Sequence, residues 1–252
     1  MLSDAKPITF AALVVAPFVG SFLAVVAVRL PQHRSIALGR SRCDACGRQL
    51  QPWELVPLVS FTLLLGRCRG CTNQISPLHP IIESAALVIA AWAAFIVTGW
   101  VLVASCLLGW ILLVLAVIDW RVGLLPDILT LPLLAMGLIV AAAIDRPSVI
   151  DHAIGAVVGF VAFAVVSDVY RRIRHREGLG LGDAKLLAAG GAWLSWSALP
   201  TVVLFAACIA LVLVLVQRPL GRGFHVTDRI AFGPALAAAI WLVWLYGPLL
   251  PY

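Results

Sequence analysis

The chain has 252 residues, of which 62% are hydrophobic and only 12% charged, with a formal net charge of +6. Globular chains are roughly 45–50% apolar and about 25% charged. With a mean hydropathy of +1.04, this composition excludes a soluble domain, since no soluble fold of this size could bury so much apolar surface. It predicts an all-α integral membrane protein.

A helix that crosses a bilayer needs about 20 mostly apolar residues, and we predict about eight such spans. The first one lacks the basic segment and the small-residue cleavage site of a signal peptide, so it is kept as a span. The sixth has the weakest signal, because it is short and rich in glycine. In chain order, the spans are expected at residues 8–28, 80–98, 101–118, 124–144, 150–170, 184–199, 200–216 and 230–247.

The positive charges are distributed unequally between the two ends of these spans. Eight spans place 16 of the 18 Lys and Arg residues on one side of the membrane and only Lys6 and Arg146 on the other. By the positive-inside rule, the arginine-rich side is cytoplasmic. The net charge therefore indicates topology and contact with anionic lipid. We expect no nucleic-acid partner, because no soluble basic domain is present to bind one.

The longest segment outside the predicted spans, residues 29–79, is here called the tetracysteine module. Two Cys-x-x-Cys pairs can close a tetrahedral zinc site, and stable disulfides are not expected in the reducing cytoplasm. Four unrelated thiols and a thioredoxin-like redox pair are the alternatives, although no βαβ pattern accompanies the cysteines. We predict a structural Zn²⁺ that supplies much of the folding energy of the module, with the ligands Cys43, Cys46, Cys68 and Cys71.

Other small and sulfur-containing residues receive simpler interpretations. Gly47 and Gly70 suit the tight turns of zinc knuckles. Cys106 and Cys208 lie inside apolar spans, and we expect both to be packing residues.

Two acidic residues stand apart from the other ten. Asp119 ends the apolar run 111–118, and Asp183 closes the glycine-rich stretch 178–183 just before the sixth span. The span count places both at the cytoplasmic membrane boundary. Two carboxylates brought close together share a proton. The ionised one can then activate water while the protonated one polarises a peptide carbonyl, as in aspartyl proteases.

A proton-coupled transporter would also use intramembrane carboxylates, but the two halves of the chain show no internal repeat. The glycine-rich stretch lacks the strand and the spacing of a phosphate-binding loop. Glu83 and Asp168 lie near cytoplasmic span ends, where they could pair with arginines or turn outward to solvent. Asp127 follows Pro126 at a helix start, where an acidic residue favours the helix dipole.

Taken together, these features resemble the bacterial type IV prepilin peptidases, which are membrane-embedded aspartyl proteases with a GxGD motif. Five blocks match in order and extend over nearly the whole chain. They are Gly20-Ser21-Phe22-Leu23 running to Arg29-Leu30-Pro31; the two cysteine pairs followed by Pro77-Leu78-His79-Pro80 and Glu83; Ile118-Asp119 through Leu125-Pro126-Asp127; Gly180-Leu181-Gly182-Asp183-Ala184-Lys185-Leu186; and Phe232-Gly233-Pro234.

The resemblance implies an active site at the cytoplasmic face of the inner membrane and cleavage of the basic leader of type IV prepilins or pseudopilins. The family's two catalytic aspartates fall on Asp119 and Asp183. Many members also methylate the new N-terminus with S-adenosylmethionine, a function tied to the tetracysteine loop. The candidate substrate- or cofactor-binding residues are Gly180, Gly182, Lys185 and Glu83.

The chain departs from the family pattern at two positions of the first span. Ala24 stands where the family usually has asparagine, and Val28 stands where it usually has tyrosine. These departures put methyltransferase activity in doubt and leave the protease motifs intact. The expected organisation is a first transmembrane helix at 1–28, the tetracysteine module at 29–79, and a seven-helix membrane peptidase core at 80–252.

Overall fold

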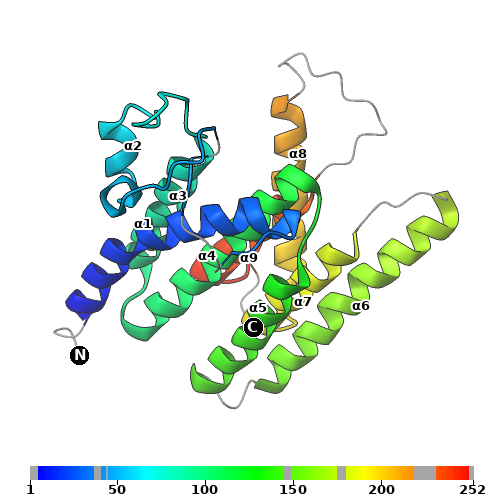
Figure 1. Ribbon diagram of the computed structural model, residues 1–252. Helices are drawn as coiled ribbons and strands as arrows, with labels where there is room; N and C mark the ends of the chain where they lie inside the picture. The colour runs from blue at the N-terminus through cyan, green and yellow to red at the C-terminus, as the bar shows by residue number, and fades with distance from the viewer. Residues whose placement is uncertain are drawn as a thin grey trace. The chain divides into compact units, whose positions relative to one another are not determined.

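The computed structural model describes residues 5–36, 41–43, 45–144, 149–174, 180–217 and 231–249. Most of these residues are helical, and none of them forms a strand apart from two isolated bridges in the tetracysteine module (Figure 1). The all-α prediction is therefore confirmed. The α-helices are α1 (Ala5–Arg29), α2 (Val59–Leu63), α3 (Leu78–Ile96), α4 (Gly99–Val122), α5 (Asp127–Ile144), α6 (Val149–Arg174), α7 (Leu181–Leu194), α8 (Leu199–Gln217) and α9 (Gly233–Tyr246), and the 3-10 turns are η1 (Leu30–Gln32) and η2 (Pro52–Leu55).

Each of the eight predicted spans corresponds to a helix. Helices α1, α3, α4, α6 and α8 are long and apolar enough to cross a membrane, and α5 and α9 are shorter apolar helices. The sixth span is wrong at its end, because α7 stops at Leu194 and Ser195 leaves the helix with a φ of 73°. Arg218, Arg222 and Arg229, which stand between the last two predicted spans, lie outside the described residues, as do Gly178 and Leu179.

The chain divides into two compact units, Met1–Val114 and Leu115–Tyr252, and α4 runs from the first into the second. In the first unit α1 packs against α3. A Cβ atom at Gly20 would lie 2.6 Å from the Cα of Glu83, so this glycine lets the two backbones approach closely. The indole of Trp110 donates a hydrogen bond to the carbonyl of Ala86 at 3.0 Å, which ties α4 to α3.

In the second unit α7 packs against α5, α6 and α9 (Figure 1). The contact with α6 depends on small residues, because a Cβ at Gly191 would lie 2.2 Å from the carbonyl oxygen of Gly155. A Cβ at Gly159 would lie 2.8 Å from the carbonyl oxygen of Leu187. Gly155 and Gly159 are four residues apart, a spacing typical of close helix contacts in membranes.

The C-terminal end of α7 is fixed by polar contacts with its neighbours. Trp193 donates its indole N–H to the carbonyl of Leu133 in α5 at 2.8 Å. The Nδ1 atom of His152 in α6 lies 3.0 Å from the carbonyl oxygen of Ala192. Because most of α7 is buried by protein, its sequence is richer in glycine and alanine than that of a lipid-facing span, which explains its weak hydropathy signal.

Candidate functional site

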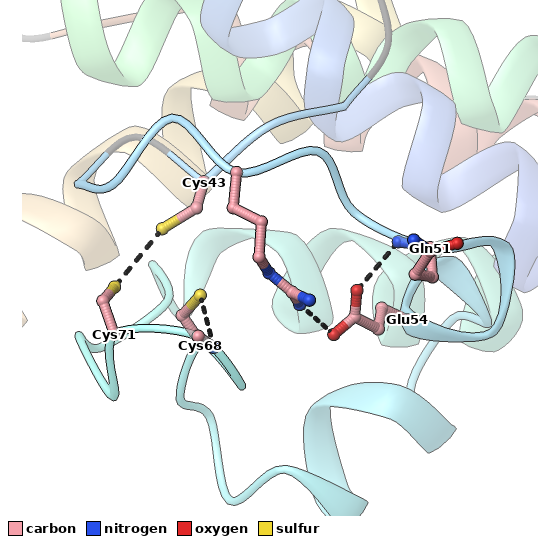
Figure 2. A network of polar contacts seen from close by, with 7 residues as sticks. Cys43, Gln51, Glu54, Cys68 and Cys71 are labelled. Atoms are coloured by element: carbon pink, nitrogen blue, oxygen red, sulfur yellow. Dashed lines mark hydrogen bonds and ion pairs between the residues drawn. The ribbon is translucent and has the colours of Figure 1, made fainter.

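The four cysteines of the tetracysteine module converge. Their sulfur atoms all lie within 4.8 Å of one another, and the Sγ atoms of Cys43 and Cys71 are 3.8 Å apart (Figure 2). Four thiolates around one zinc ion, each at about 2.3 Å, are about 3.8 Å from one another. The Cys43–Cys71 separation matches this value, and all four sulfur atoms are close enough together to surround one metal ion.

Each cysteine pair lies on a tight turn with the same backbone pattern. The N–H of Cys43 donates to the carbonyl of Arg48, and the N–H of Cys68 donates to that of Asn73, both at 2.9 Å. Gly47 has a φ of +69° in the first turn, as expected. Gly70 lies in the second turn, also as expected, but there Thr72 holds the left-handed position with a φ of +56°.

Gly70 also contributes a backbone contact to the cysteine cluster. Its backbone N–H points at the Sγ atom of Cys68 at 3.4 Å. Backbone N–H groups of Cys71 and Gly70 lower the pKa of the Cys68 thiol to about 6. Since the thiolate is the form that binds metal, this turn favours the ligating state of Cys68.

An ion pair between Arg48 and Glu54 stabilises the first turn. The guanidinium of Arg48 donates to Glu54, and the N–H of Gln51 donates to the same carboxylate at 2.8 Å (Figure 2). The Gln51 N–H and the Arg48 side chain together hold the pKa of Glu54 below its usual range. This contact positions Arg48 beside the cluster, where a Cβ at Gly70 would lie 3.1 Å from its Cδ atom.

The two remaining cysteines differ from each other. Cys106 is buried, as predicted for a packing residue, but Cys208 is exposed on α8. The prediction for Cys208 is wrong because an apolar sequence around a residue does not determine which face of a membrane helix contacts protein.

Glu83 is buried near the start of α3. Sequence analysis suggested an arginine partner, but its Oε2 atom accepts a hydrogen bond from the backbone N–H of Leu58 at 2.8 Å. Leu58 has a φ of 61°, a conformation rare for a branched residue, so this bond helps to hold a strained turn. Glu83 also lines a cavity of about 390 Å³ within the first unit.

Asp119 lies in the last turn of α4 and is buried. The helix continues to Val122, beyond the predicted end at residue 118. Its Oδ2 atom accepts a hydrogen bond from the backbone N–H of Gly233, the first residue of α9, at 3.0 Å. This carboxylate is thus held by a residue 114 positions away in the sequence.

Asp183 is also buried, and it lies in the first turn of α7, whereas the sequence placed it just before the helix. Its Oδ2 atom accepts the N–H of Gly180 at 3.3 Å. The charge of Asp119 acts on Asp183, so the fold of the second unit brings the two carboxylates within electrostatic reach. Each has one oxygen atom engaged by a backbone N–H.

The other predicted residues of this region lie around the two aspartates. A Cβ at Gly182 would lie 2.9 Å from the Cβ of Leu125, so this glycine allows α7 to begin against the chain that precedes α5. Lys185 donates to both carboxylate oxygens of Asp127 at 2.6 and 2.7 Å. Asp127 is the first residue of α5, as predicted, but its lysine partner was not anticipated.

Asp168 bonds to Arg171 at 2.8 Å and to Arg172 at 2.7 Å, which confirms the arginine pairing predicted for it. Sequence analysis singled out the block Phe232-Gly233-Pro234 without giving it a role. Its contact with Asp119 is the main feature of the site that the sequence did not reveal. The order of the five matching sequence blocks along the chain does not indicate that Gly233 contacts Asp119.

Two known families match most of the chain. Residues 14–97 match the family described as Bacterial Peptidase A24 N-terminal domain. Residues 106–215 match the Type IV leader peptidase family. The second match contains both aspartates, and the first contains the four cysteines.

Several proteins named Prepilin leader peptidase/N-methyltransferase are similar to this chain. The one from Burkholderia pseudomallei is 41% identical over 211 residues, covering 83% of this chain and 68% of its own. That from Aeromonas hydrophila is 37% identical over 254 residues, covering 91% and 87%. That from Stutzerimonas stutzeri is 36% identical over 268 residues, covering 96% and 92%. No solved structure matches the chain significantly.

Proposed function

Because this chain belongs to the type IV leader peptidase family, we propose that it is an aspartic endopeptidase that removes the basic leader from type IV prepilins or pseudopilins. Asp119 and Asp183 are the proposed catalytic pair. One observation carries this proposal. Two buried carboxylates from different helices interact, and each has one oxygen fixed by a backbone N–H.

The proposed reaction uses the pair as a unit. The two carboxylates share one proton, and the ionised member takes a proton from a water molecule as that water attacks the scissile carbonyl. The protonated member donates a hydrogen bond to the carbonyl oxygen. When the C–N bond breaks, the pair returns a proton to the leaving amine, which becomes the N-terminus of the mature pilin.

Single substitutions test the assignment directly. Asp119→Asn and Asp183→Asn should each abolish cleavage of a co-expressed prepilin, because an amide cannot take the proton from water. Asp168→Asn is the matched control, since Asp168 is also a helix aspartate but is paired with arginines. Leader removal is scored by gel shift in a host without its own leader peptidase. Cleavage by either of the first two variants would refute the catalytic pair.

We place the aspartate pair at the cytoplasmic face of the inner membrane. The distribution of the 18 Lys and Arg residues supports this sidedness by the positive-inside rule. A reporter fused after residue 174, in the segment that follows α6, should be active only if it is a cytoplasmic reporter. An active periplasmic reporter at the same point would reverse the orientation.

For the tetracysteine module we propose a structural zinc ion. The sulfur separations support it, and four cysteine ligands leave no open position for chemistry. The bound ion would cross-link the two turns that carry the cysteine pairs. Metal analysis of the purified protein should give one zinc per chain.

Methylation of the new N-terminus is the second candidate function, and the cavity of the first unit favours it. Its volume of about 390 Å³ falls in the roughly 300–1,000 Å³ range of small-molecule sites. Both signs of charge line it, as the carboxylate and the cationic groups of S-adenosylmethionine require. When bound, that cofactor supplies an electrophilic methyl group. The lining residues that would hold it include Ser21, Val28, Arg29, Arg34, Glu54 and Glu83.

This second function is tested separately from cleavage. Titration calorimetry with S-adenosylmethionine measures binding, and mass spectrometry of the mature pilin detects a gain of one methyl group. Val28 lines the cavity, so the departure from the family pattern at this position lies within the candidate site. An unmodified mature pilin together with no measurable binding would restrict this chain to the peptidase reaction.

A further inference from the structure

We propose that Gly233 is the positioning residue of the aspartate pair, and that the start of α9 is therefore part of the peptidase site. The backbone N–H of Gly233 fixes the orientation of the Asp119 carboxylate, and the absence of a side chain allows that contact. This inference rests on the proposed peptidase function and extends it to a region of the chain far from the GxGD motif.

The contact leaves no space for an added atom. The N–H of Gly233 lies 3.0 Å from the Oδ2 atom of Asp119 in a buried position. A Cβ at Gly233 would lie 2.6 Å from that oxygen and 2.9 Å from Cγ of the same carboxylate. Gly233 has no positive φ, so glycine is needed here for space and not for backbone conformation.

The start of α9 suits this role for two further reasons. The first N–H groups of a helix have no partner within it and favour a negative charge. Pro234 has no N–H to donate, which leaves the Gly233 N–H as the donor directed at Asp119. The ring of Phe232 packs against Phe163 of α6 with ring centroids 6.1 Å apart, which fixes the residue before Gly233.

The bond holds one oxygen of the carboxylate and so determines where the other points. With Oδ2 engaged by Gly233, Oδ1 is the oxygen available for the shared proton or for the attacking water. A displacement of about 1 Å in a reacting group can reduce turnover about a hundredfold. Moving Asp119 away from Gly233 should therefore reduce turnover without changing how the substrate binds.

Three glycines near the aspartate pair differ in how much space they leave for a Cβ atom, and the GxGD motif does not predict the order. A Cβ at Gly180 would have only an ordinary contact, at 3.6 Å from Oδ2 of Asp183. A Cβ at Gly182 would meet the Cβ of Leu125 at 2.9 Å, which shifts packing beside the pair. Only at Gly233 would the new atom strike a carboxylate of the pair. The loss of turnover should thus be greatest for Gly233→Ala, intermediate for Gly182→Ala and smallest for Gly180→Ala.

The experiment uses the full-length protein in detergent and a purified type IV prepilin from Burkholderia pseudomallei as the substrate. Gly233→Ala should lower kcat about a hundredfold while KM stays at the wild-type value. Gly190→Ala is the matched control in the same unit. Its Cβ would meet no backbone atom, only Cδ1 and Cγ1 of the Ile240 side chain, both at 3.0 Å, so its kcat and melting temperature should stay much closer to the wild-type values than those of Gly233→Ala.

A backbone substitution separates positioning from packing. Replacing Gly233 by glycolic acid converts its amide to an ester and removes the N–H without adding a side chain. Hydrogen bonds to charged groups contribute roughly 1.5–3 kcal/mol, so kcat should fall about tenfold to a hundredfold at unchanged KM. This variant gives a decisive result even if Gly233→Ala fails to fold.

The outcomes separate the catalytic role of the aspartate pair from the positioning role of Gly233. If Asp119→Asn still cleaves, the proposed catalytic pair fails and the role of Gly233 fails with it. If Asp119→Asn is inactive but the ester variant retains the wild-type kcat, only the positioning role is overturned. The same conclusion follows if Gly233→Ala folds and cleaves as well as Gly190→Ala.

Discussion

The tetracysteine module and the aspartate pair are both polar sites in an apolar chain, but they are assembled in different ways. In the module the described side-chain contacts shown above join residues no more than 28 positions apart. Around the aspartates, Lys185 reaches Asp127 across 58 positions and Gly233 reaches Asp119 across 114. The module depends on local turns and, as we propose, on a zinc ion, whereas the aspartate pair depends on how helices pack.

Because the two sites are assembled differently, we expect different changes to destabilise them. A site built from local turns in a segment too small to bury a core should lose its structure when the metal is removed. A site built from closely packed helices should tolerate metal removal and fail when atoms are added to glycines at the helix contacts.

The largest expected effect is that of Cys43→Ser. Structural zinc supplies roughly 10–16 kcal/mol in zinc-finger peptides, so losing one ligand should unfold the module and expose it to proteases. Limited proteolysis with mass spectrometry should show new cleavage between residues 41 and 76. Cys208→Ser is the control, because Cys208 is exposed and remote from the cluster in sequence. An unchanged digestion pattern in zinc-free Cys43→Ser would contradict the required metal.

A smaller but clear loss is expected for Gly191→Ala. Its Cβ would lie 2.2 Å from the carbonyl oxygen of Gly155, and backbone atoms cannot move aside as a side chain can. Overpacking typically costs about 1–3 kcal/mol, and the contact between α6 and α7 should weaken by at least that amount. Thermal unfolding in detergent measures it, with the adjacent Gly190→Ala as the comparison. Equal melting temperatures for the two variants would show that the helices are not held this closely.

Glu54→Gln should make the module less stable at pH 7 than at low pH relative to the wild type. The pKa of Glu54 is lowered by the Gln51 N–H and by Arg48, so its stabilisation is complete above the unfolded-state pKa of 4.5. It disappears as the pH falls through the lower folded-state pKa. Denaturant unfolding of both proteins at pH 7 and pH 4 tests this. A difference that grows towards acid pH would have the wrong sign.

The smallest expected effect is that of Asp127→Asn. The Asp127 and Lys185 side chains are 55% and 33% exposed, and exposed ion pairs contribute about 0–1 kcal/mol. The variant should therefore melt within a few degrees of the wild type, and its melting temperature should be less sensitive to added salt. A loss as large as that of Gly191→Ala would mean that this pair positions α5 against α7.

The sequence by itself determined the features that depend on local chemistry. Uninterrupted apolar stretches predicted the helices, because a chain in lipid must satisfy its backbone hydrogen bonds within each segment. The Cys-x-x-Cys spacing predicted the cluster, because each pair lies on one turn. Asp119 and Asp183 were selected because a carboxylate at the edge of an apolar run is costly unless it has a role.

Only the tertiary structure decided the features that depend on which helix faces meet. The end of α7 at Leu194, the exposure of Cys208 and the partner of Glu83 have no signature in a hydropathy pattern. The contact of Gly233 with Asp119 is the clearest case. A glycine has no side chain whose chemistry could indicate a role in the sequence. Gly233 becomes important only because packing brings a distant carboxylate against its N–H.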